Sequence, residues 1–195
     1  MEADGVDLII MDDGFQNPSL DKTLSILVVD AQAGFGNGYV IPKGPLREPV
    51  EAGLSRADAI ILMGDGEPPL ALADFGGPIL RAAIQPLSSP PPKTYLAFAG
   101  IGRPEKFFDT LNTCGTPPVD AVPFADHHRY SARDIRYLHT LAADHQAQLI
   151  TTEKDFVRLS PEQREGIVTL PVGAHFANEA ELDSLLSSVT EHLAS

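Results

Sequence analysis

Three short apolar runs, each ending directly in a polar turn, constrain the fold of this chain more than any other feature. The runs cover residues 6–11 before Asp12-Asp13-Gly14, 24–29 before Asp30, and 57–63 before Gly64-Asp65-Gly66. Short uninterrupted apolar runs are typical of strands that are buried on both faces of a parallel sheet. The pattern therefore predicts an open α/β sheet, in which ligands bind beyond the carboxyl ends of the strands.

A Pro- and Ser-rich stretch at residues 86–93 interrupts this pattern, because it can continue neither a helix nor a strand. Beyond it the pattern restarts with helices that begin at Pro104, at Ser131 and near Asn178. Asp134, three residues after Ser131, completes the pattern of a capping box. Further strands are expected at residues 94–99, 119–124, 149–152 and 167–172. We predict two α/β domains, at residues 1–85 and 86–195.

Charge and composition exclude several functional classes. The formal net charge is −13, which disfavours nucleic acid as a partner, since phosphate backbones are bound by Lys and Arg. The single Cys114 cannot form an internal disulfide, as is usual in a reducing cytoplasm. The sequence contains no run of about 18 apolar residues, so we expect no helix that spans a bilayer.

Two acidic and basic segments of the first domain are candidates for phosphate and metal chemistry. Asp12 and Asp13 follow an apolar run, as do the carboxylates that hold Mg²⁺ in P-loop nucleotidases. Arg47 and Glu48 lie in Gly44-Pro45-Leu46-Arg47-Glu48-Pro49, where Arg47 could bind a phosphate and Glu48 a metal or Arg47 itself. The alternatives are a solvated turn and a surface ion pair, and the residues alone leave both open.

The second domain carries one further candidate segment, Asp126-His127-His128, between an expected strand and a capped helix. Polar groups at a helix N-terminus suit anion binding, and histidine suits proton transfer near neutral pH. The alternative is a polar loop in which one histidine caps the helix and the other is solvated. For the later segment Thr151-Thr152-Glu153-Lys154-Asp155 we expect a structural role.

Taken together, six segments resemble the tetraacyldisaccharide 4'-kinases, the lipid kinases of lipid A biosynthesis. The resemblance runs over nearly the whole chain, and six segments in one order are far more specific than any one of them. The segments are Asp12-Asp13-Gly14-Phe15-Gln16, Gly34-Phe35-Gly36-Asn37-Gly38, Gly44-Pro45-Leu46-Arg47-Glu48-Pro49, Phe98-Ala99-Gly100-Ile101-Gly102-Arg103-Pro104, Phe124-Ala125-Asp126-His127-His128-Arg129-Tyr130 and Thr151-Thr152-Glu153-Lys154-Asp155.

The resemblance implies a fold and a reaction. It implies that residues 1–85 are the C-terminal part of a P-loop, RecA-like kinase core and that 86–195 form a smaller α/β domain. The two would be joined by a two-stranded hinge, for which residues 78–85 and 167–176 are the candidates. The implied reaction transfers the γ-phosphoryl group of ATP to the 4'-hydroxyl of tetraacyldisaccharide 1-phosphate. The implied location is the cytoplasmic face of the inner membrane, with peripheral association.

The resemblance also implies roles for individual residues. Asp12, Asp13 and Glu48 match residues around Mg²⁺, and Arg47 and Arg103 are the candidates for contacts with the nucleotide. The implied catalytic residues are Asp126, His127 and His128. Of the two histidines, His127 is the better match for the family histidine that pairs with a catalytic aspartate.

The sequence departs from the family pattern in ways that affect activity. It contains no G-x-x-x-x-G-K-[ST] segment, and so no P-loop to hold the phosphates of ATP. The family's Gly-Asp-Glu-Pro segment with its catalytic aspartate and the membrane-associating N-terminal helix have no match. Asn17 and Lys43 replace the usual His and Ala. We interpret the chain as a C-terminal fragment that is inactive alone.

Two other functional classes remain as alternatives. One is a metal phosphoesterase of the Asp-His-His type, with Mn²⁺ held by Asp126 and His127. The other is a non-catalytic module that binds lipid. The phosphoesterase leaves the Gly-Pro-Leu-Arg-Glu-Pro segment unexplained, and the missing P-loop favours the binding module for the isolated chain.

Overall fold

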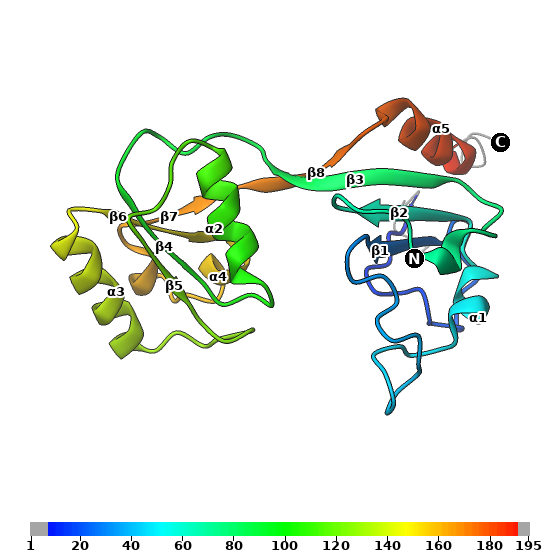
Figure 1. Ribbon diagram of the computed structural model, residues 1–195, viewed down its shortest axis with the longest axis horizontal. Coiled ribbons are helices and arrows are strands. Elements are labelled where there is room, and N and C mark those ends of the chain that lie inside the picture. The colour runs from blue at the N-terminus through cyan, green and yellow to red at the C-terminus, as the bar shows by residue number, and fades with distance from the viewer. Residues whose placement is uncertain (1–7, 191–195) are drawn as a thin grey trace. The chain divides into compact units, whose positions relative to one another are not determined.

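The computed structural model describes residues 8–190, which divide into two compact units (Figure 1). The first unit holds the chain up to Ile84 and again from Ala174 onward, and the second is Gln85–Gly173. The division thus falls one residue before the predicted boundary at 85/86, whereas the residues from Ala174 group with the first unit and not with the second. No helix within residues 8–190 has the length and apolar character needed to cross a membrane.

The first unit is built on a four-stranded sheet in the order β1-β2-β3-β8. The β1–β2 and β2–β3 pairs are parallel, as predicted. The β3–β8 pair is antiparallel, because hydrogen bonds join Leu87 N to Pro171 O and Ala177 N to Arg81 O. The strands are β1 (Ile26–Asp30), β2 (Ala59–Met63), β3 (Ile79–Pro86) and β8 (Val172–Phe176).

The core of the first unit lies on one face of this sheet. Val29 is 3% exposed, whereas the neighbouring Val28, which points to the other face, is 60% exposed. Buried residues of β1 and β2 pack with Leu72 and Phe75. The helical elements are α1 (Val50–Leu54), the 3-10 helix η2 (Leu70–Leu72) and α5 (Glu179–Thr190).

The predicted buried strand at residues 6–11 is wrong over its described part, and positions 6 and 7 lie outside the described residues. Residues 8–11 form no strand, and Ile10 is 86% exposed. A strand buried on both faces needs neighbouring strands and covering layers. Among the described residues, β1 at the sheet edge pairs with β2 alone, and no strand pairs with residues 8–11. An apolar run cannot form a strand without such a partner.

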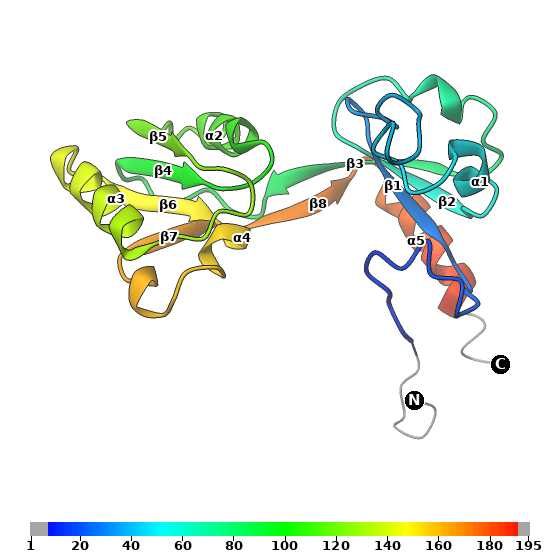
Figure 2. The ribbon, with the colours of Figure 1, turned by 90° about the horizontal axis from the view of Figure 1, so that it is seen from below.

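The second unit is a parallel sheet in the order β5-β4-β6-β7 (Figure 2). Its strands are β4 (Tyr95–Ala99), β5 (Asp120–Pro123), β6 (Gln148–Thr152) and β7 (Ile167–Leu170). Its helical elements are α2 (Pro104–Thr113), α3 (Ala132–Asp144), the short α4 (Glu153–Phe156) and the 3-10 helix η3 (Glu162–Arg164). Side chains of successive strand residues point to opposite faces of a sheet. Helix α3 packs on one face of this sheet and helix α2 on the other, so both faces are covered.

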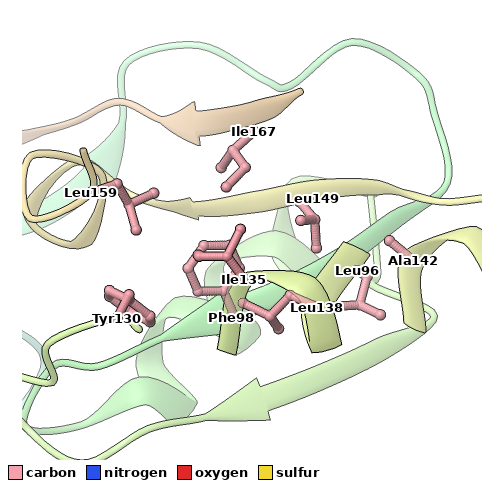
Figure 3. Packing of buried hydrophobic residues seen from close by; sticks show 9 residues of the cluster. All are labelled: Leu96, Phe98, Tyr130, Ile135, Leu138, Ala142, Leu149, Leu159 and Ile167. Carbon is pink, nitrogen blue, oxygen red and sulfur yellow. The ribbon is translucent and has the colours of Figure 1, made fainter. Parts of the chain in front are cut away.

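Strand β4 shows this alternation directly. Leu96 and Phe98 pack against α3, while Tyr95, Ala97 and Ala99 pack against α2. Figure 3 shows Leu96 and Phe98 meeting side chains of α3 and β6 in one of these two cores. The sheet is therefore buried on both faces, and the strand expected at residues 94–99 lies at its centre.

The ends of the helices follow the sequence closely. Ser131 is the N-cap of α3, and its capping box with Asp134 is complete in both directions. Pro104 occupies the first turn of α2. The predicted pairing of residues 78–85 with 167–176 is also present, although only β8 pairs with β3, while β7 belongs to the second sheet. The chain passes between the two units inside these paired strands. That they act as a hinge remains a prediction.

Candidate functional site

In the first unit, Asp13 and Arg47 form a bidentate ion pair. Nη1 and Nη2 of Arg47 donate to the two oxygens of Asp13 at 2.9 and 3.0 Å. Asp13 has a φ of 51°, a left-handed conformation that aspartate tolerates better than most residues. This turn brings its carboxylate to a guanidinium 34 positions along the chain. Asp12, beside it, is exposed.

Glu48 forms a second ion pair close by. Nη2 of Arg56 donates to both oxygens of Glu48 at 2.7 Å, and Gln16 Nε2 donates to one of them at 3.1 Å. Gln16 Oε1 also accepts from Arg47 at 3.4 Å. Gln16 thus joins the two ion pairs, and we call these five residues, Asp13, Gln16, Arg47, Glu48 and Arg56, the acid–arginine network.

Both carboxylates of this network are held in the ionised form. The hydrogen bonds and charge of Arg47 lower the pKa of Asp13 below its ordinary value. The hydrogen bond from Arg56, with help from Gln16, lowers the pKa of Glu48. Since three of these four side chains are about half exposed or more, the pairs contribute little to stability. Their main effect is to orient the carboxylates and neutralise them.

The network has the right donor type for Mg²⁺, which prefers carboxylate oxygens and water. In this arrangement, however, both oxygens of Asp13 and of Glu48 already accept hydrogen bonds from arginine. Within residues 8–190, no three acidic, His or Cys side chains gather as a metal site requires. The predicted ligands are therefore brought together in part, but the arrangement fits arginine-neutralised carboxylates and not a formed metal site.

Freeing one carboxylate should strengthen cation binding. We expect Arg47→Ala to tighten the binding of Mn²⁺, used in place of Mg²⁺, by about two- to fivefold, the equivalent of one exposed ion pair. Water-proton relaxation measures this affinity. Arg81→Ala is the matched control, because Arg81 belongs to the same unit but donates to the carbonyl oxygen of Gly66. If Arg47→Ala and Arg81→Ala tightened Mn²⁺ binding equally, the loss of one positive charge would explain the change, and the freed Asp13 carboxylate would not.

The glycine-rich segment and the Gly-Pro-Leu-Arg-Glu-Pro segment fold as one loop. Asn37 Nδ2 donates to Lys43 O at 3.0 Å, and Asn37 Oδ1 accepts from Tyr39 N at 3.1 Å. Gly44 lies so close to Asn37 and Tyr39 that no Cβ would fit. The loop borders an open hollow of about 750 Å³, and Lys43 Nζ lies 3.7 Å from the centre of the Tyr39 ring. The loop thereby fixes the backbone just before Arg47, where Leu46 N donates to Tyr39 O at 3.2 Å and Leu46 O accepts from Ile41 N at 2.9 Å.

In the second unit, His127 is exposed but held in place. Its φ is 57°, and its N–H donates to Gly100 O at 3.0 Å and to Asp126 Oδ1 at 2.9 Å. Arg158 Nη2 lies 3.2 Å from the ring Nδ1, and the ring Nε2 lies 3.8 Å from Asp126 Oδ2. The side chain is 81% exposed, so Nε2 is accessible to solvent.

His128, by contrast, is part of the packing. Its Nε2 lies 3.2 Å from Asp134 Oδ2, inside the capping box of α3. Its ring packs at 4.6 Å from the ring of Phe124 and 5.0 Å from that of Tyr130, measured between centres. Hydrogen bonds from Ser131 and then from His128 lower the pKa of Asp134. The geometry therefore separates the two histidines, since His128 supports the helix start while His127 faces solvent.

Arg158, which contacts His127, also binds a buried carboxylate, that of Asp155, which is 0% exposed. It accepts hydrogen bonds from Tyr130 Oη at 2.9 Å and Arg158 Nη1 at 3.1 Å. Thr152 caps α4 and also donates to this carboxylate. Burial and the charge of Asp155 raise the pKa of Tyr130 far above its ordinary value, so the phenol stays a donor. The structural role expected of the Thr151–Asp155 segment agrees with this geometry, and Arg158, which lies in none of the six segments, belongs to the same cluster.

Arg103 is the N-cap residue of α2 and is exposed. Asp126 lies nearby, since a Cβ built on Gly102 would be 3.6 Å from Asp126 Oδ2.

The Asp-His-His phosphoesterase gains no support, because it needs several acidic and histidine ligands around Mn²⁺. Within the described part of the chain no such group of three exists around Asp126 and His127.

Gly100 leaves room for this arrangement. A Cβ at this position would lie 3.0 Å from both His128 Cβ and Tyr130 Oη. We expect Gly100→Ala to destabilise the second unit by about 1–3 kcal/mol, the usual cost of overpacking. Urea unfolding followed by circular dichroism measures the change. Gly102→Ala is the control, since its Cβ would meet only ordinary contacts, and an equal loss in both variants would contradict the explanation.

Comparison with known proteins gives consistent matches over almost the whole chain. Residues 1–191 match the family model described as Tetraacyldisaccharide-1-P 4'-kinase. A tetraacyldisaccharide 4'-kinase of Hyphomonas neptunium is 54% identical over 189 residues, which are 97% of this chain and 57% of that relative. The corresponding protein of Maricaulis maris is 50% identical over 195 residues, again 97% and 57%. The chain therefore spans little more than half the length of these relatives.

A solved structure shares the fold. It is the crystal structure of the "apo" form of LpxK from Aquifex aeolicus in complex with ATP. The TM-score is 0.61 at 24% identity, over 89% of this chain and 55% of that one. The α/β architecture described above is thus shared with part of that structure.

Proposed function

This chain belongs to the tetraacyldisaccharide-1-P 4'-kinase family, and we propose that it forms part of an ATP-dependent lipid kinase. The reaction transfers the γ-phosphoryl group of ATP to the 4'-hydroxyl of a tetraacyldisaccharide 1-phosphate, a lipid A precursor. The observation that carries the proposal is the 54% identity to a tetraacyldisaccharide 4'-kinase over 97% of this chain. The proposal concerns the whole kinase, of which this chain spans about 57% by that comparison.

The acid–arginine network is the proposed site for phosphate and metal. Phosphoryl transfer depends on positioning and on neutralising charge around the γ-phosphate. Arg47, with its two parallel donors, and Arg103 are proposed to bind phosphate oxygens. Asp12, Asp13 and Glu48 are the proposed holders of Mg²⁺, which when bound would neutralise phosphate charge. Because arginines occupy two of these carboxylates, metal binding would require both ion pairs to open.

His127 is the proposed catalytic histidine, and Asp126 is its proposed partner within this chain. The exposed ring and accessible Nε2 support this choice, since a group that assists proton transfer must be open to the site where the substrate binds. His128 is the weaker candidate, because its Nε2 is bound to Asp134 and its ring is packed against Phe124. We assign it a supporting role.

The proposed location is the cytoplasmic face of the inner membrane, with the protein associated peripherally. A single cysteine and a formal net charge of −13 are compatible with the cytoplasm and argue against nucleic acid as a partner. The membrane contact is proposed to come from the part of the relatives that this chain does not span.

The isolated chain should not phosphorylate the lipid, because its sequence holds no G-x-x-x-x-G-K-[ST] segment to hold ATP. A chimera that adds the remainder of the Hyphomonas neptunium relative should. Transfer of label from γ-³²P-ATP to tetraacyldisaccharide 1-phosphate, resolved by thin-layer chromatography, measures both. Labelled product from the isolated chain, or none from a folded chimera, would refute the proposal. Hydrolysis of p-nitrophenyl phosphate with Mn²⁺ would instead support the phosphoesterase.

A further inference from the structure

We propose that Arg158, anchored on the buried Asp155, is a positioning residue that fixes the orientation and the tautomer of His127. The hydrogen bonds from Asp155 through Arg158 to His127 do not depend on the function of the protein, whereas their use in catalysis rests on the kinase function proposed above. Arg158 contacts the His127 ring at Nδ1, and Asp155 acts on that ring only through Arg158. Their effect would reach the site only through the His127 ring.

The anchor is rigid because the Asp155 carboxylate is fully buried and fully bonded. Each oxygen accepts two hydrogen bonds. Oδ1 accepts from Tyr130 Oη and Arg158 Nη1, at 2.9 and 3.1 Å. Oδ2 accepts from Thr152 Oγ1 and the N–H of Gly100, at 2.7 and 3.1 Å. A buried charge satisfied in this way is costly to displace, so it holds Arg158 firmly.

Arg158 connects this anchor to the surface. Its Nη1 donates to Asp155 and also to Gly100 O at 2.8 Å, while its Nη2 lies 3.2 Å from His127 Nδ1. The guanidinium group is planar and carries its donors in a fixed fork. Once Nη1 is bound to two acceptors, the direction of Nη2 is set as well.

The tautomer of His127 follows from hydrogen-bond chemistry. A guanidinium group has donors only, so Nδ1 of His127 must be the acceptor. In the neutral ring the proton therefore lies on Nε2. Because the ring is 81% exposed, packing restrains it little, and the bond from Arg158 is the main restraint on its side chain. The backbone of His127 is held at the same place, since its N–H also donates to Gly100 O.

This assignment defines what His127 can do. With Nδ1 occupied and the proton on Nε2, the neutral ring presents a donor to the surface. Asp126 Oδ2 is 3.8 Å from Nε2, close enough to receive that donor after a small movement. His127 would thus orient and hydrogen-bond an acceptor group, such as a carboxylate that itself takes the proton of the hydroxyl.

The test is nitrogen NMR on the 195-residue chain with ¹⁵N-labelled histidine, without ATP or lipid. At about pH 8.5 an ordinary histidine is neutral, and its two ring nitrogens report the tautomer. We expect His127 to be almost entirely in the Nε2–H form. Arg158→Leu should shift the ratio about fivefold toward Nδ1–H, which corresponds to one hydrogen bond of about 1 kcal/mol.

Two further variants complete the design. Asp155→Asn does not touch His127 and should move its tautomer in the same direction, through Arg158. Arg164→Leu removes the same charge from the same unit, but Arg164 bonds the carbonyl oxygens of Phe156 and Val157 and should leave His127 unchanged.

An unchanged His127 tautomer in a folded Arg158→Leu chain would overturn the inference, as would an equal shift in Arg164→Leu. Amide spectra show whether each variant is folded, and Arg158→Leu decides the question if Asp155→Asn does not fold. Because no substrate is used, a negative result here leaves the proposed kinase function untouched, and an inactive kinase would leave this result standing.

Discussion

His127→Ala, introduced into the active chimera, is expected to lower kcat by about 10²–10⁴-fold, the usual contribution of a group that assists proton transfer. KM for ATP and for the lipid should change little, because the interaction matters in the transition state and not in ground-state binding. The thermal stability should stay near that of the parent, since the His127 side chain is 81% exposed. Steady-state kinetics with melting curves measure both.

His128→Ala is the matched control, one position along the chain. It removes the bond to Asp134 and the ring contacts with Phe124 and Tyr130, so it should cost about 1–3 kcal/mol of stability. Its kcat at low temperature should stay close to that of the parent. An inactive His128→Ala with an active His127→Ala would show that the two roles are reversed.

Asp155→Ala is expected to destabilise the second unit by about 3–5 kcal/mol, as the removal of one partner of a buried ion pair usually does. The substitution leaves the charge of Arg158 and the hydroxyl of Tyr130 without their acceptor. Urea unfolding of the chain measures the loss. Asp144→Ala, at the exposed end of α3, should stay within about 0.5 kcal/mol of the parent. If Asp155→Ala also lowered the free energy of unfolding by less than about 0.5 kcal/mol, the Asp155 carboxylate would not be the anchor that holds Arg158.

The contact between Tyr130 and Asp155 should make the free energy of unfolding depend on pH in the alkaline range. The pKa of Tyr130 is raised in the folded state by burial and by Asp155, above the ordinary value of 10.0. The folded chain therefore keeps a proton that the unfolded chain loses. Its stabilising effect is complete below pH 10.0 and declines as the pH rises above that value. Tyr130→Phe should reduce this decline, measured as the fall in the free energy of unfolding with rising pH.

Local signals in the sequence were sufficient for most of the second unit. The apolar residues at 94–99 predicted the strand β4, and the Ser131 and Asp134 pair predicted the start of α3. These features depend on residues close together in the chain. The short helix α4 was not expected, because Thr152, its N-cap, also reads as the end of a strand.

Features that depend on distant residues could not be predicted in this way. Residues 8–11 have the composition of a buried strand, but without a pairing strand they remain exposed. The return of the chain to the first unit at Ala174 depends on the pairing of β8 with β3. In the site, the family resemblance pointed to His127, whereas Arg158 lies 31 positions away and only the fold brings it to the ring.

The acid–arginine network shows the same limit. The sequence predicted that Glu48 reaches a metal or holds Arg47. In the structure Glu48 binds Arg56, eight positions along the chain, while Arg47 binds Asp13. The sequence pointed to the segment as a candidate, whereas its partners depend on the fold of a loop that the Asn37 hydrogen bonds and Gly44 help to shape. Candidate residues were therefore easier to find than their contacts.

The most direct test of the account is to locate the phosphate that the chimera adds to its lipid. Phosphorus NMR with proton correlation, applied to the product of the reaction with ATP, identifies the sugar carbon that bears the new group. We expect one new phosphomonoester, at the 4'-position, formed only when ATP is present. A phosphate at any other position, or loss of the 1-phosphate in place of a gain at 4', would contradict it.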